Sequence, residues 1–495
     1  MSPIKTSKMT NYRWVICAML FLATTVNYMD RQVLSLTYPG DGGIQQEFGW
    51  TDDNYGTITA WFSIFYAVFM LFAGKFIDWM GTKKGYLWAI FVWSTGAVIH
   101  AFCGIATSGI VTGEWFVGFE GALENLRAFK ASGAADAGLV ISTVSMWLFL
   151  GARAILALGE AGNFPAAIKV TAEYFPKKDR AFATAIFNSG ASVGALIAPF
   201  TIPILAKFFG WEMAFIVIGA LGYIWMGFWI FLYKKPNKNK RVNAAELTYI
   251  NQDTDTEGDS KELNDEGPAI NFFKCFTFRQ TWAFIVGKFM TDGVWWFFLF
   301  WTPAYLKSQF NINPTDTEGM VLIFVLYLIT MLSILGGKLP TYFINKGMNP
   351  YAGRMRAMLI FAFFPLLGLV AQPLGDIFAT PWFPIILIGI LGAAHQSWSA
   401  NIFSTVGDMF PKSTIATITG IGGMAGGVGS FLINKGAGAL FTYAEGQGAA
   451  FKFLGFEGKP AGYMIVFCIC AVAYLIGWMI MKILVPKYKP VVVEE

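Results

Sequence analysis

The stretch WVICAMLFLATTVNYMDR, residues 14–31, is a long apolar run that ends in an acid and a base. Up to Met29 it contains no charged side chain, so it is apolar enough to enter a lipid bilayer. Asp30 and Arg31 then follow on consecutive positions. A charge near the bilayer centre costs about 2.5–3.5 kcal/mol on insertion scales, and such residues usually serve a function. The stretch therefore predicts a membrane-spanning helix that carries a functional pair of charges.

Apolar runs of this kind recur along the whole chain. Of the 495 residues, 55% are hydrophobic and only 14% are charged, which argues against a soluble globular protein. A run of about 20 apolar residues is long enough to cross a hydrocarbon core about 30 Å thick. We therefore predict an all-α integral membrane protein with twelve transmembrane helices, at residues 14–36, 57–77, 86–106, 140–167, 183–205, 213–233, 281–306, 318–340, 357–373, 381–405, 413–434 and 462–485.

Basic residues gather in every second loop, counted from the N-terminus. The loops on one side contain Lys83, Lys84, Lys177, Lys178, Arg180, Lys346, Arg354 and Arg356. The loops on the other side are poorer in Lys and Arg, so the positive-inside rule predicts that both termini are cytoplasmic. These loops also account for the net charge of +5, and no basic stripe is formed, so nucleic acid is not predicted as a partner.

A polar segment at residues 234–280 separates the sixth predicted span from the seventh. It begins with basic residues and continues with an acidic stretch from Asp253 to Glu266, which is the composition of a solvated linker whose charges need no function. We therefore predict an N-terminal six-helix bundle at 1–233 and a C-terminal one at 281–495. A second polar interruption, 107–138, is predicted as an extra outer loop with a short amphipathic surface helix.

The two predicted bundles are related by an internal repeat. Glu173-Tyr-Phe-Pro-Lys177 recurs 235 residues later as Asp408-Met-Phe-Pro-Lys412. Each copy leads into a glycine-rich span, and Gly190 and Gly194 have the spacing that lets helices pack closely. The run GIGGMAGGVG, 420–429, follows no predicted strand, so it is not interpreted as a dinucleotide-binding loop. Repeats of six helices are a transporter architecture, so we expect two pseudo-repeat bundles.

Six charged residues within the predicted spans are the candidates for chemistry. The acids are Asp30, Glu160 and Asp292, and the bases are Arg31, Arg153 and Lys288. Lys288 and Asp292 stand at i and i+4, a spacing that allows a direct ion pair. Arg153 and Glu160 are two helical turns apart and point the same way. One interpretation is that such pairs only neutralise each other and lock helices together. Because buried ion pairs add little net stability, the alternative is that a base receives an anionic substrate while an acid changes protonation.

Polar and aromatic side chains in the same spans are candidates for the lining of a substrate cavity. They are Tyr28, Tyr66, Trp295, Trp296, His395, Gln396, Trp398, Ser399 and Asn401. The planar fork of an arginine suits a carboxylate, because it donates two parallel hydrogen bonds. The chain has only two histidines and no HExxH, GxSxG or P-loop sequence, so we predict no enzyme, no metal site and no cofactor. An ion gradient must then supply the energy.

The loop after the second span carries a sequence motif. It reads Gly74-Lys-Phe-Ile-Asp78-Trp-Met-Gly81-Thr-Lys83-Lys84. This run resembles the GxxxDxxGxKK signature of the major facilitator superfamily, in which the acidic residue and the basic end help to latch the cytoplasmic gate. The resemblance implies a gate function for Gly74, Asp78, Gly81, Lys83 and Lys84.

Further motifs make the chain similar to the anion:cation symporters of that superfamily. These motifs are YxDR at 28–31, RxxLxLGExxxxP at 153–165 and FPxxxRAxA at 175–183. The stretches KFMTDGVWWFFLFWTPAYL, 288–306, and AHQSWSAN, 394–401, extend the resemblance to the bacterial hexuronate transporters, which import glucuronate and galacturonate.

The resemblance implies a proton symporter of hexuronate anions that works by alternating access, functions as a monomer and lies in the bacterial inner membrane. It implies that Asp30, Glu160 and Asp292 carry protons. It implies a substrate site with Tyr28, Arg31, Tyr66 and Arg153. We expect Lys288 and Asp292 to select uronates, and Trp296, His395 and Asn401 to complete the site. Another sugar acid such as galactonate, sodium coupling, and a nutrient sensor built on a transporter fold remain open as alternatives.

Overall fold

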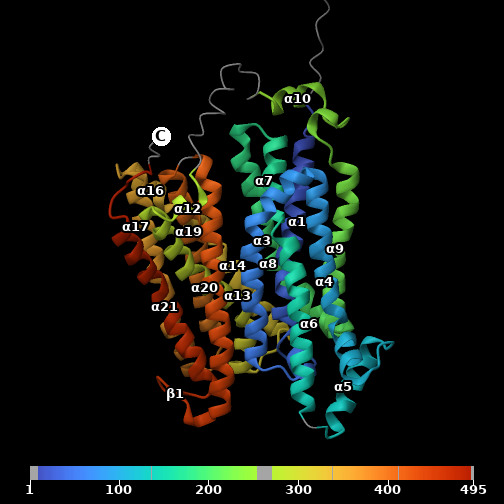
Figure 1. Ribbon diagram of the computed structural model, residues 1–495. Coiled ribbons are helices and arrows are strands. Elements are labelled where there is room, and N and C mark those ends of the chain that lie inside the picture. Colours follow the sequence, from blue (N-terminus) through green and yellow to red (C-terminus); the bar gives the residue numbers. More distant parts are fainter. Residues whose placement is uncertain (1–8, 135, 253–269, 337, 411, 492–495) are drawn as a thin grey trace, which may run out of the picture.

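The computed structural model describes residues 9–134, 136–252, 270–336, 338–410 and 412–491, and most of these residues are helical. The apolar runs form helices because a backbone in lipid has to satisfy its hydrogen bonds within its own segment. Twelve helical segments of the described chain run through the length of the molecule (Figure 1). They are α1 (Tyr12–Thr37), α3 (Asp52–Met80), α4 (Thr82–Thr112), α6 with α7 (Ala137–Glu160, Asn163–Tyr174), α8 (Lys177–Phe209), α9 (Trp211–Leu232), α13 (Arg279–Phe310), α14 to α16 (Thr317–Thr330, Ser333–Gly336, Leu339–Asn345), α17 with η2 and α18 (Pro350–Phe363, Phe364–Leu367, Gly368–Ile377), α19 (Trp382–Met409), α20 (Lys412–Gln447) and α21 (Lys459–Leu484).

Ten of these segments are long and apolar enough to cross a membrane by length and composition. The other two are α1 and α20. In α1 the apolar run is interrupted by polar residues such as Asn27, Asp30 and Arg31, and α20 is rich in glycine. The prediction of an all-helical membrane protein with twelve long helices is confirmed.

Shorter elements connect the long helices. They are α2 (Ile44–Phe48), α5 (Phe119–Ala131), η1 (Pro236–Lys238), α10 (Ala244–Ile250), α12 (Phe272–Cys275), η3 (Gly448–Ala450) and the antiparallel pair β1 (Lys452–Phe453) and β2 (Phe456–Glu457). Helix α5 confirms the surface helix expected within 107–138. The insertion is shorter than expected, because α4 continues to Thr112 and α6 already begins at Ala137.

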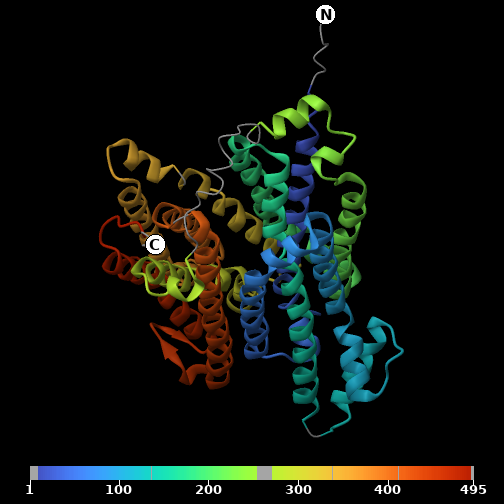
Figure 2. The ribbon, with the colours of Figure 1, turned by 45° about the horizontal axis from the view of Figure 1, so that its top comes forward.

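The long helices lie in two groups side by side, one formed by residues 12–232 and the other by residues 279–484 (Figure 1). The start of α1 and the end of the described chain lie at the same end of the molecule, which we call the terminal end (Figure 2). Helix α5 and the β1–β2 hairpin lie at the opposite end, which we call the far end. The domain boundaries at 1–233, 234–280 and 281–495 stay predictions.

Ion pairs join the two groups of helices at the far end. The ammonium of Lys435 lies 2.6 Å from a carboxylate oxygen of Asp53, and that of Lys459 lies 2.5 Å from one of Asp52. The hydroxyl of Tyr55 donates to a main-chain carbonyl of α13 at 2.6 Å. Because each contact pairs α3 with the second group, they close the far end of the molecule.

Glycines allow the closest helix contacts. A Cβ atom on Gly190 or Gly194 of α8 would overlap the backbone of α1, and one on Gly429 of α20 would overlap the backbone of α13. Gly56 and Gly438 similarly let α3 and α20 touch backbone to backbone at the far end. The prediction that the glycine motifs serve helix packing is confirmed.

The segment expected to be a solvated linker contains a buried acid, so that expectation is wrong for Glu246. This residue of α10 is fully buried, and its carboxylate lies 3.0 Å from the guanidinium of Arg13. It also accepts hydrogen bonds from the backbone N–H groups of Tyr12 and Arg13, at the start of α1. An anion at a helix N-terminus is stabilised by these N–H groups, so α10 caps α1. The acidic stretch 253–266 lies outside the described residues.

Candidate functional site

Helix α1 carries two neighbouring charged side chains that reach different partners. Asp30 and Arg31 are consecutive, so their side chains leave the helix about 100° apart. Asp30 contacts α4 and Arg31 contacts α6. Both side chains are buried. One helix therefore supplies an acid and a base to two separate contacts.

Arg31 forms an ion pair and is also surrounded by aromatic rings. Its Nε donates to Oε2 of Glu160 at 2.8 Å. The guanidinium carbon lies 4.4 Å from the ring centroid of Tyr66 and 5.0 Å from that of Tyr28. Trp296, which belongs to the second group of helices, places its ring 5.9 Å away. Such rings stabilise a cation without neutralising it. Because Nη2 of Arg31 has no hydrogen-bond partner among the described residues, the guanidinium keeps a donor for a further acceptor.

Glu160 stands where a helix is interrupted. Helix α6 ends at Glu160 and α7 begins at Asn163, whereas a continuous span was expected at 140–167. Gly159 and Gly162 flank the acid and press against α4, where added Cβ atoms would collide with Trp93 and Ala89. The two linking residues, Ala161 and Gly162, keep right-handed helical angles, so α6 and α7 form one span that is disturbed only next to the acid. The Oε1 atom of Glu160 has no partner among the described residues, so this carboxylate is only half satisfied.

The carboxylate of Asp30 accepts a hydrogen bond from a tryptophan of α4. The indole Nε1 of Trp93 donates to Oδ2 of Asp30 at 2.8 Å, while Oδ1 has no partner within the described chain. Asn27, one turn earlier on α1, is fully buried, and neither of its amide atoms has a partner there. Buried polar groups are usually hydrogen-bonded, so this part of α1 is unusual in keeping donor and acceptor atoms that are not used. Neither Trp93 nor Asn27 was predicted as a site residue.

Arg153 lies two helical turns before Glu160 on α6. Its guanidinium carbon is 5.2 Å from the ring centroid of Phe62, and the side chain is buried. It makes no ion pair with any described residue, and its Nη1 has no hydrogen-bond partner. A buried guanidinium without a counter-ion is costly, so Arg153 is available to an anion that enters the protein.

In the second group, Lys288 and Asp292 confirm the direct ion pair that their spacing predicted. The ammonium lies 2.7 Å from Oδ2 of Asp292 and 4.4 Å from the ring centroid of Phe403. The carboxylate packs against Gly426 of α20, where a Cβ atom would overlap it. This geometry fits both a structural pair and a substrate contact, so the two interpretations stay open.

His395 and Asn401 contact neighbours within the second group. The Nδ1 atom of His395 lies 2.6 Å from the hydroxyl of Tyr474, and its ring stacks on Trp295 at 5.5 Å. The amide nitrogen of Asn401 donates to the main-chain carbonyl of Ser397, one turn earlier on α19, at 2.8 Å. Within the described residues neither side chain touches the Arg31–Glu160 pair, so their place in a substrate site stays a prediction.

The gate motif lies at the terminal end, between α3 and α4. Gly81 has a φ of +76°, a conformation that favours glycine. The ammonium of Lys83 donates to the main-chain carbonyl of Ile230 at 2.7 Å, while Lys84 is exposed. Nothing lies within 4 Å of a Cβ atom built on Gly74, so packing does not explain this glycine. The side chain of Asp78 lies outside the described part of the structure.

A neighbouring contact of the gate motif was not predicted. Thr82 donates to a carboxylate oxygen of Glu173 at 2.5 Å, and the hydroxyl of Tyr233 donates to the other oxygen. Glu173 opens the repeated Glu173-Tyr-Phe-Pro-Lys177 stretch. The two motifs that the sequence shows separately are therefore joined within the first group of helices.

The structure thus brings part of the predicted site together. The residues that meet at the boundary of the two groups are Tyr28, Arg31, Tyr66, Glu160 and Trp296. Trp296 also contacts Phe62, the ring that lies against Arg153. Aromatic faces around a base that keeps free N–H donors suit a ligand with an acidic group and a ring.

Known proteins with similar sequences are transporters. The hexuronate transporter of Escherichia coli (strain K12) is 27% identical over 436 residues, which cover 88% of this chain and 88% of that protein. The galacturonate transporter of Dickeya chrysanthemi is 24% identical over 344 residues, 68% of this chain and 84% of that protein. The D-galactonate transporter of Escherichia coli O6:H1 is 25% identical over 455 residues, 90% of this chain and 93% of that protein.

Solved structures of transporters share the fold. A bacterial homologue of the human lysosomal transporter Spinster, in an inward-facing and occupied conformation, matches with a TM-score of 0.65 and 16% identity over 96% of this chain and 97% of that chain. A D-xylose-proton symporter matches with a TM-score of 0.63 and 14% identity, over 94% and 98%. The family model of the Major Facilitator Superfamily matches residues 20–433. The chain therefore belongs to the Major Facilitator Superfamily, as a multi-pass membrane protein of the secondary-transporter type.

Proposed function

We propose that the protein imports hexuronate anions, glucuronate and galacturonate, together with protons. The observation that carries this proposal is the Arg31–Glu160 pair, a buried base that is held by an acid and still keeps an unused donor. The names of the relatives, transporters of hexuronate, galacturonate and D-galactonate, support a sugar acid as the substrate class.

Competition for Arg31 links substrate to proton. The carboxylate of a uronate binds the fork of Arg31 in two parallel hydrogen bonds and draws the guanidinium away from Glu160. A buried carboxylate that has lost its cation is costly to keep ionised, so Glu160 takes up a proton. Release of the proton on the other side restores the pair and expels the substrate.

The neighbouring residues take complementary roles in this proposal. Arg153, which has no counter-ion within the described chain, adds a second positive charge for the anion. The rings of Tyr28, Tyr66 and Trp296 pack on the apolar face of the sugar. Asp30 and Asp292 are further proton carriers. Lys288 selects uronates, and His395 and Asn401 complete the substrate site.

Alternating access sets which contacts have to break. With both termini in the cytoplasm of a bacterium, as the positive-inside rule predicts, the far end faces outward across the inner membrane. The Asp52–Lys459 and Asp53–Lys435 pairs then hold the outer side closed, and substrate enters from outside only after they separate. The gate motif, with Gly74, Asp78, Gly81, Lys83 and Lys84, closes the opposite side in turn. One chain contains the whole pathway, so we propose that the monomer is functional.

Two other substrates or couplings remain as alternatives. The similarity to a D-galactonate transporter favours an aldonate as the second candidate. Carboxylates also bind sodium, which would replace the proton. One proton with one monoanion is electroneutral, whereas two protons would gain about 2.3 kcal/mol per 100 mV of membrane potential. A sensor function is the alternative from another class and predicts binding without accumulation.

The decisive experiment measures uptake of labelled glucuronate into proteoliposomes under an inward proton gradient, with a sodium gradient as the parallel condition. Galactonate is added as the competing anion. Proton-driven accumulation that resists galactonate supports the proposal. Accumulation that requires sodium overturns the coupling, preference for galactonate overturns the substrate, and binding without any accumulation favours the sensor.

A further inference from the structure

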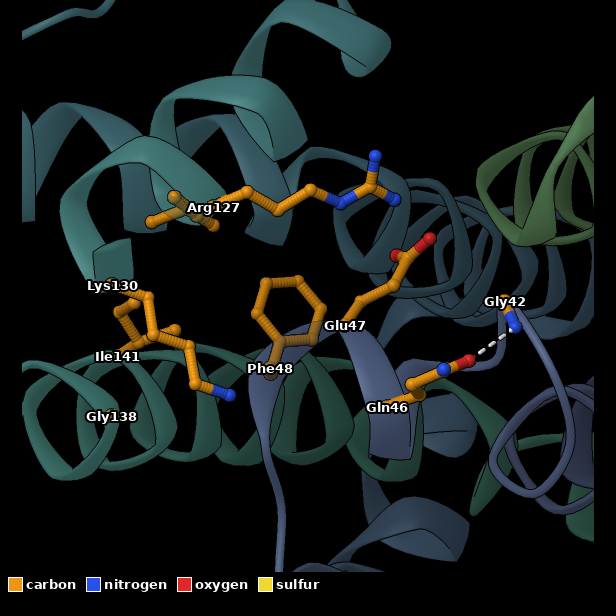
Figure 3. Close-up of a pocket in the computed structure, with 9 residues that line it drawn as sticks. Gly42, Gln46, Glu47, Phe48, Arg127, Lys130, Gly138 and Ile141 are labelled. Atoms are coloured by element: carbon orange, nitrogen blue, oxygen red, sulfur yellow. Dashed lines mark hydrogen bonds between the residues drawn. The ribbon is translucent and has the colours of Figure 1, made fainter.

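A pocket lies at the far end, away from the Arg31–Glu160 pair. Its volume is about 360 Å³, within the usual range of small-molecule sites. It is formed by α2, by the inserted helix α5 and by the start of α6 (Figure 3). The lining residues are Gly42, Gln46, Glu47, Phe48, Leu126, Arg127, Lys130, Gly138 and Ile141.

Two bases of α5 line this pocket without a partner. Arg127 and Lys130 are three residues apart and therefore share a face of the helix. Neither makes a hydrogen bond or an ion pair with any residue that the structure describes, although Glu124 stands one turn before Arg127 on the same helix. Like charges at this spacing repel each other, and an anion between them would turn that repulsion into attraction.

The other walls offer groups for the rest of a ligand. Gln46 accepts a hydrogen bond from the backbone N–H of Gly42 at 2.7 Å, so its amide nitrogen is left as a donor. The ring of Phe48 provides an apolar surface, and Figure 3 shows it between Lys130 and Glu47. Glu47 is held by the indole N–H of Trp211, which donates to Oε2 at 2.5 Å.

We propose that this pocket is an accessory site for a small carboxylate anion that also carries hydroxyl groups. Arg127 and Lys130 bind the carboxylate, Gln46 donates to a hydroxyl group, and Phe48 packs against the carbon skeleton. The transported sugar acid has this chemistry, and its identification as the ligand rests on the proposed function. The inserted helix thereby acquires a role, since it contributes both bases.

The charge of Glu47 makes this site sensitive to pH. Burial raises the pKa of Glu47 to about 7; the hydrogen bond from Trp211 opposes this shift, nearby Glu212 adds to it, and Arg127 opposes it. Below pH 7 the acid is neutral and the two bases act alone. Above pH 7 its negative charge competes with the ligand for Arg127, so anion affinity falls as the pH rises.

The charged groups around Glu47 come from several elements. Helix α5 contributes Arg127 and Lys130, and α9 contributes Glu212. Asp41, the residue before the lining residue Gly42, pairs with Lys307 at 3.6 Å. The lining residues from α6 are uncharged. Glu47 is therefore the acid in direct contact with the pocket whose charge changes near neutral pH.

The test measures binding of labelled glucuronate to the purified full chain by equilibrium dialysis at pH 6. Four proteins are compared: wild type, Arg127→Ala/Lys130→Ala, Arg31→Ala, and the control Lys207→Ala/Lys452→Ala, which removes two exposed bases outside the pocket. The inference expects two sites per wild-type chain. The Arg127→Ala/Lys130→Ala protein loses one of them, weakened at least about tenfold because charge-assisted contacts are removed. Arg31→Ala loses the other site, and the control keeps both.

The outcomes separate this inference from the proposed function. A single wild-type site that Arg31→Ala removes and Arg127→Ala/Lys130→Ala leaves intact overturns the accessory site alone. A single wild-type site that Arg127→Ala/Lys130→Ala removes and Arg31→Ala leaves intact supports the accessory site and overturns the central one. Absence of binding to the wild type overturns both.

Glu47→Gln provides a second measurement. The affinity of the accessory site in this variant should stay constant between pH 6 and pH 8. An affinity that still falls as the pH rises contradicts the role assigned to Glu47.

Discussion

The Nε atom of Arg31 lies 2.8 Å from Oε2 of Glu160, and this ion pair between α1 and the end of α6 is buried on both sides. Each residue of the pair keeps one polar atom that has no hydrogen-bond partner in the described chain: Nη2 in Arg31 and Oε1 in Glu160. A fully satisfied pair would only lock the two helices. A pair with spare capacity on each side can exchange its partners, which is what coupling requires.

Glu160→Gln should separate exchange from accumulation. The amide is close in shape to the carboxyl group and stays neutral, so Arg31 is free to bind substrate while no proton is carried. We expect exchange of labelled for unlabelled glucuronate to persist and uptake against a gradient to disappear, both measured in proteoliposomes. Accumulation at the wild-type level would show that Glu160 is not the coupling acid.

Arg31→Ala should abolish substrate binding and also destabilise the fold. Removing one partner of a buried pair leaves an uncompensated charge, at a cost of about 3–5 kcal/mol. The double variant Arg31→Ala/Glu160→Gln removes both charges, so we expect its thermal unfolding temperature to return toward the wild-type value while glucuronate binding stays absent. Binding restored in the double variant would place the substrate carboxylate elsewhere.

The fold and the charged residues were predictable because they leave local signals. Apolar length marks a span, and a charge inside one, such as Asp30, is conspicuous against it. The Lys288–Asp292 contact was predictable because an i, i+4 spacing fixes the distance along one helix. Spacing along the chain was sufficient for these features.

Partners from distant segments were not predictable. Trp93 donates to Asp30 across 63 positions, and it could not be singled out in a chain with 17% aromatic residues. Asn27 lacked a signal of its own within an apolar run. The contacts of His395 with Trp295 and Tyr474 were not predictable either, since depth in the membrane does not specify the direction of a side chain, and its place in the substrate site stays a prediction. Glu246 was assigned to a linker by composition, which cannot show that α10 folds back onto α1.

Glu47 should make the stability of the protein depend on pH. Burial raises its pKa from an ordinary 4.5 to about 7 in the folded chain, so folding disfavours the ionised form. The contribution of neutral Glu47 to the stability of the folded chain is therefore fully present below about pH 4.5, and it is lost as the pH rises toward 7. We expect the wild-type unfolding temperature, followed by tryptophan fluorescence, to fall across this window relative to that of Glu47→Gln. The control Glu120→Gln, an exposed acid on α5, should follow the wild type; parallel curves for Glu47→Gln and wild type would contradict the shift.

Lys288 should govern the choice among sugar acids if its pair with Asp292 does more than join two positions of α13. The variant Lys288→Met/Asp292→Asn removes both charges, keeps comparable volumes and leaves no buried charge unpaired. We expect the ratio of glucuronate to galactonate inhibition constants, measured by competition in uptake, to change at least about tenfold, which corresponds to 1.4 kcal/mol. An unchanged ratio with normal uptake would assign the pair a purely structural role.

Lys459→Ala should open the far end. The ammonium of Lys459 lies 2.5 Å from Oδ2 of Asp52, which is buried and otherwise accepts from the hydroxyl of Tyr38 at 3.0 Å. Without Lys459 this carboxylate stays unpaired in the closed arrangement, so the arrangement that exposes it to water is favoured. A cysteine at Ser430, whose hydroxyl lies 2.8 Å from that of Ser63 across the two groups of helices, reports the change.

The rate at which a membrane-impermeant thiol reagent labels Ser430→Cys should rise at least about tenfold when Lys459→Ala is added, since a population shift of 1.4 kcal/mol corresponds to that factor. Lys452→Ala is the matched control, because it breaks an exposed ion pair with Glu457 within the hairpin at the same end. When Lys452→Ala is added instead, Ser430→Cys should be labelled at the same rate as without it. Equal rates for Lys459→Ala and Ser430→Cys alone would mean that the Asp52–Lys459 pair is not the lock of the far end.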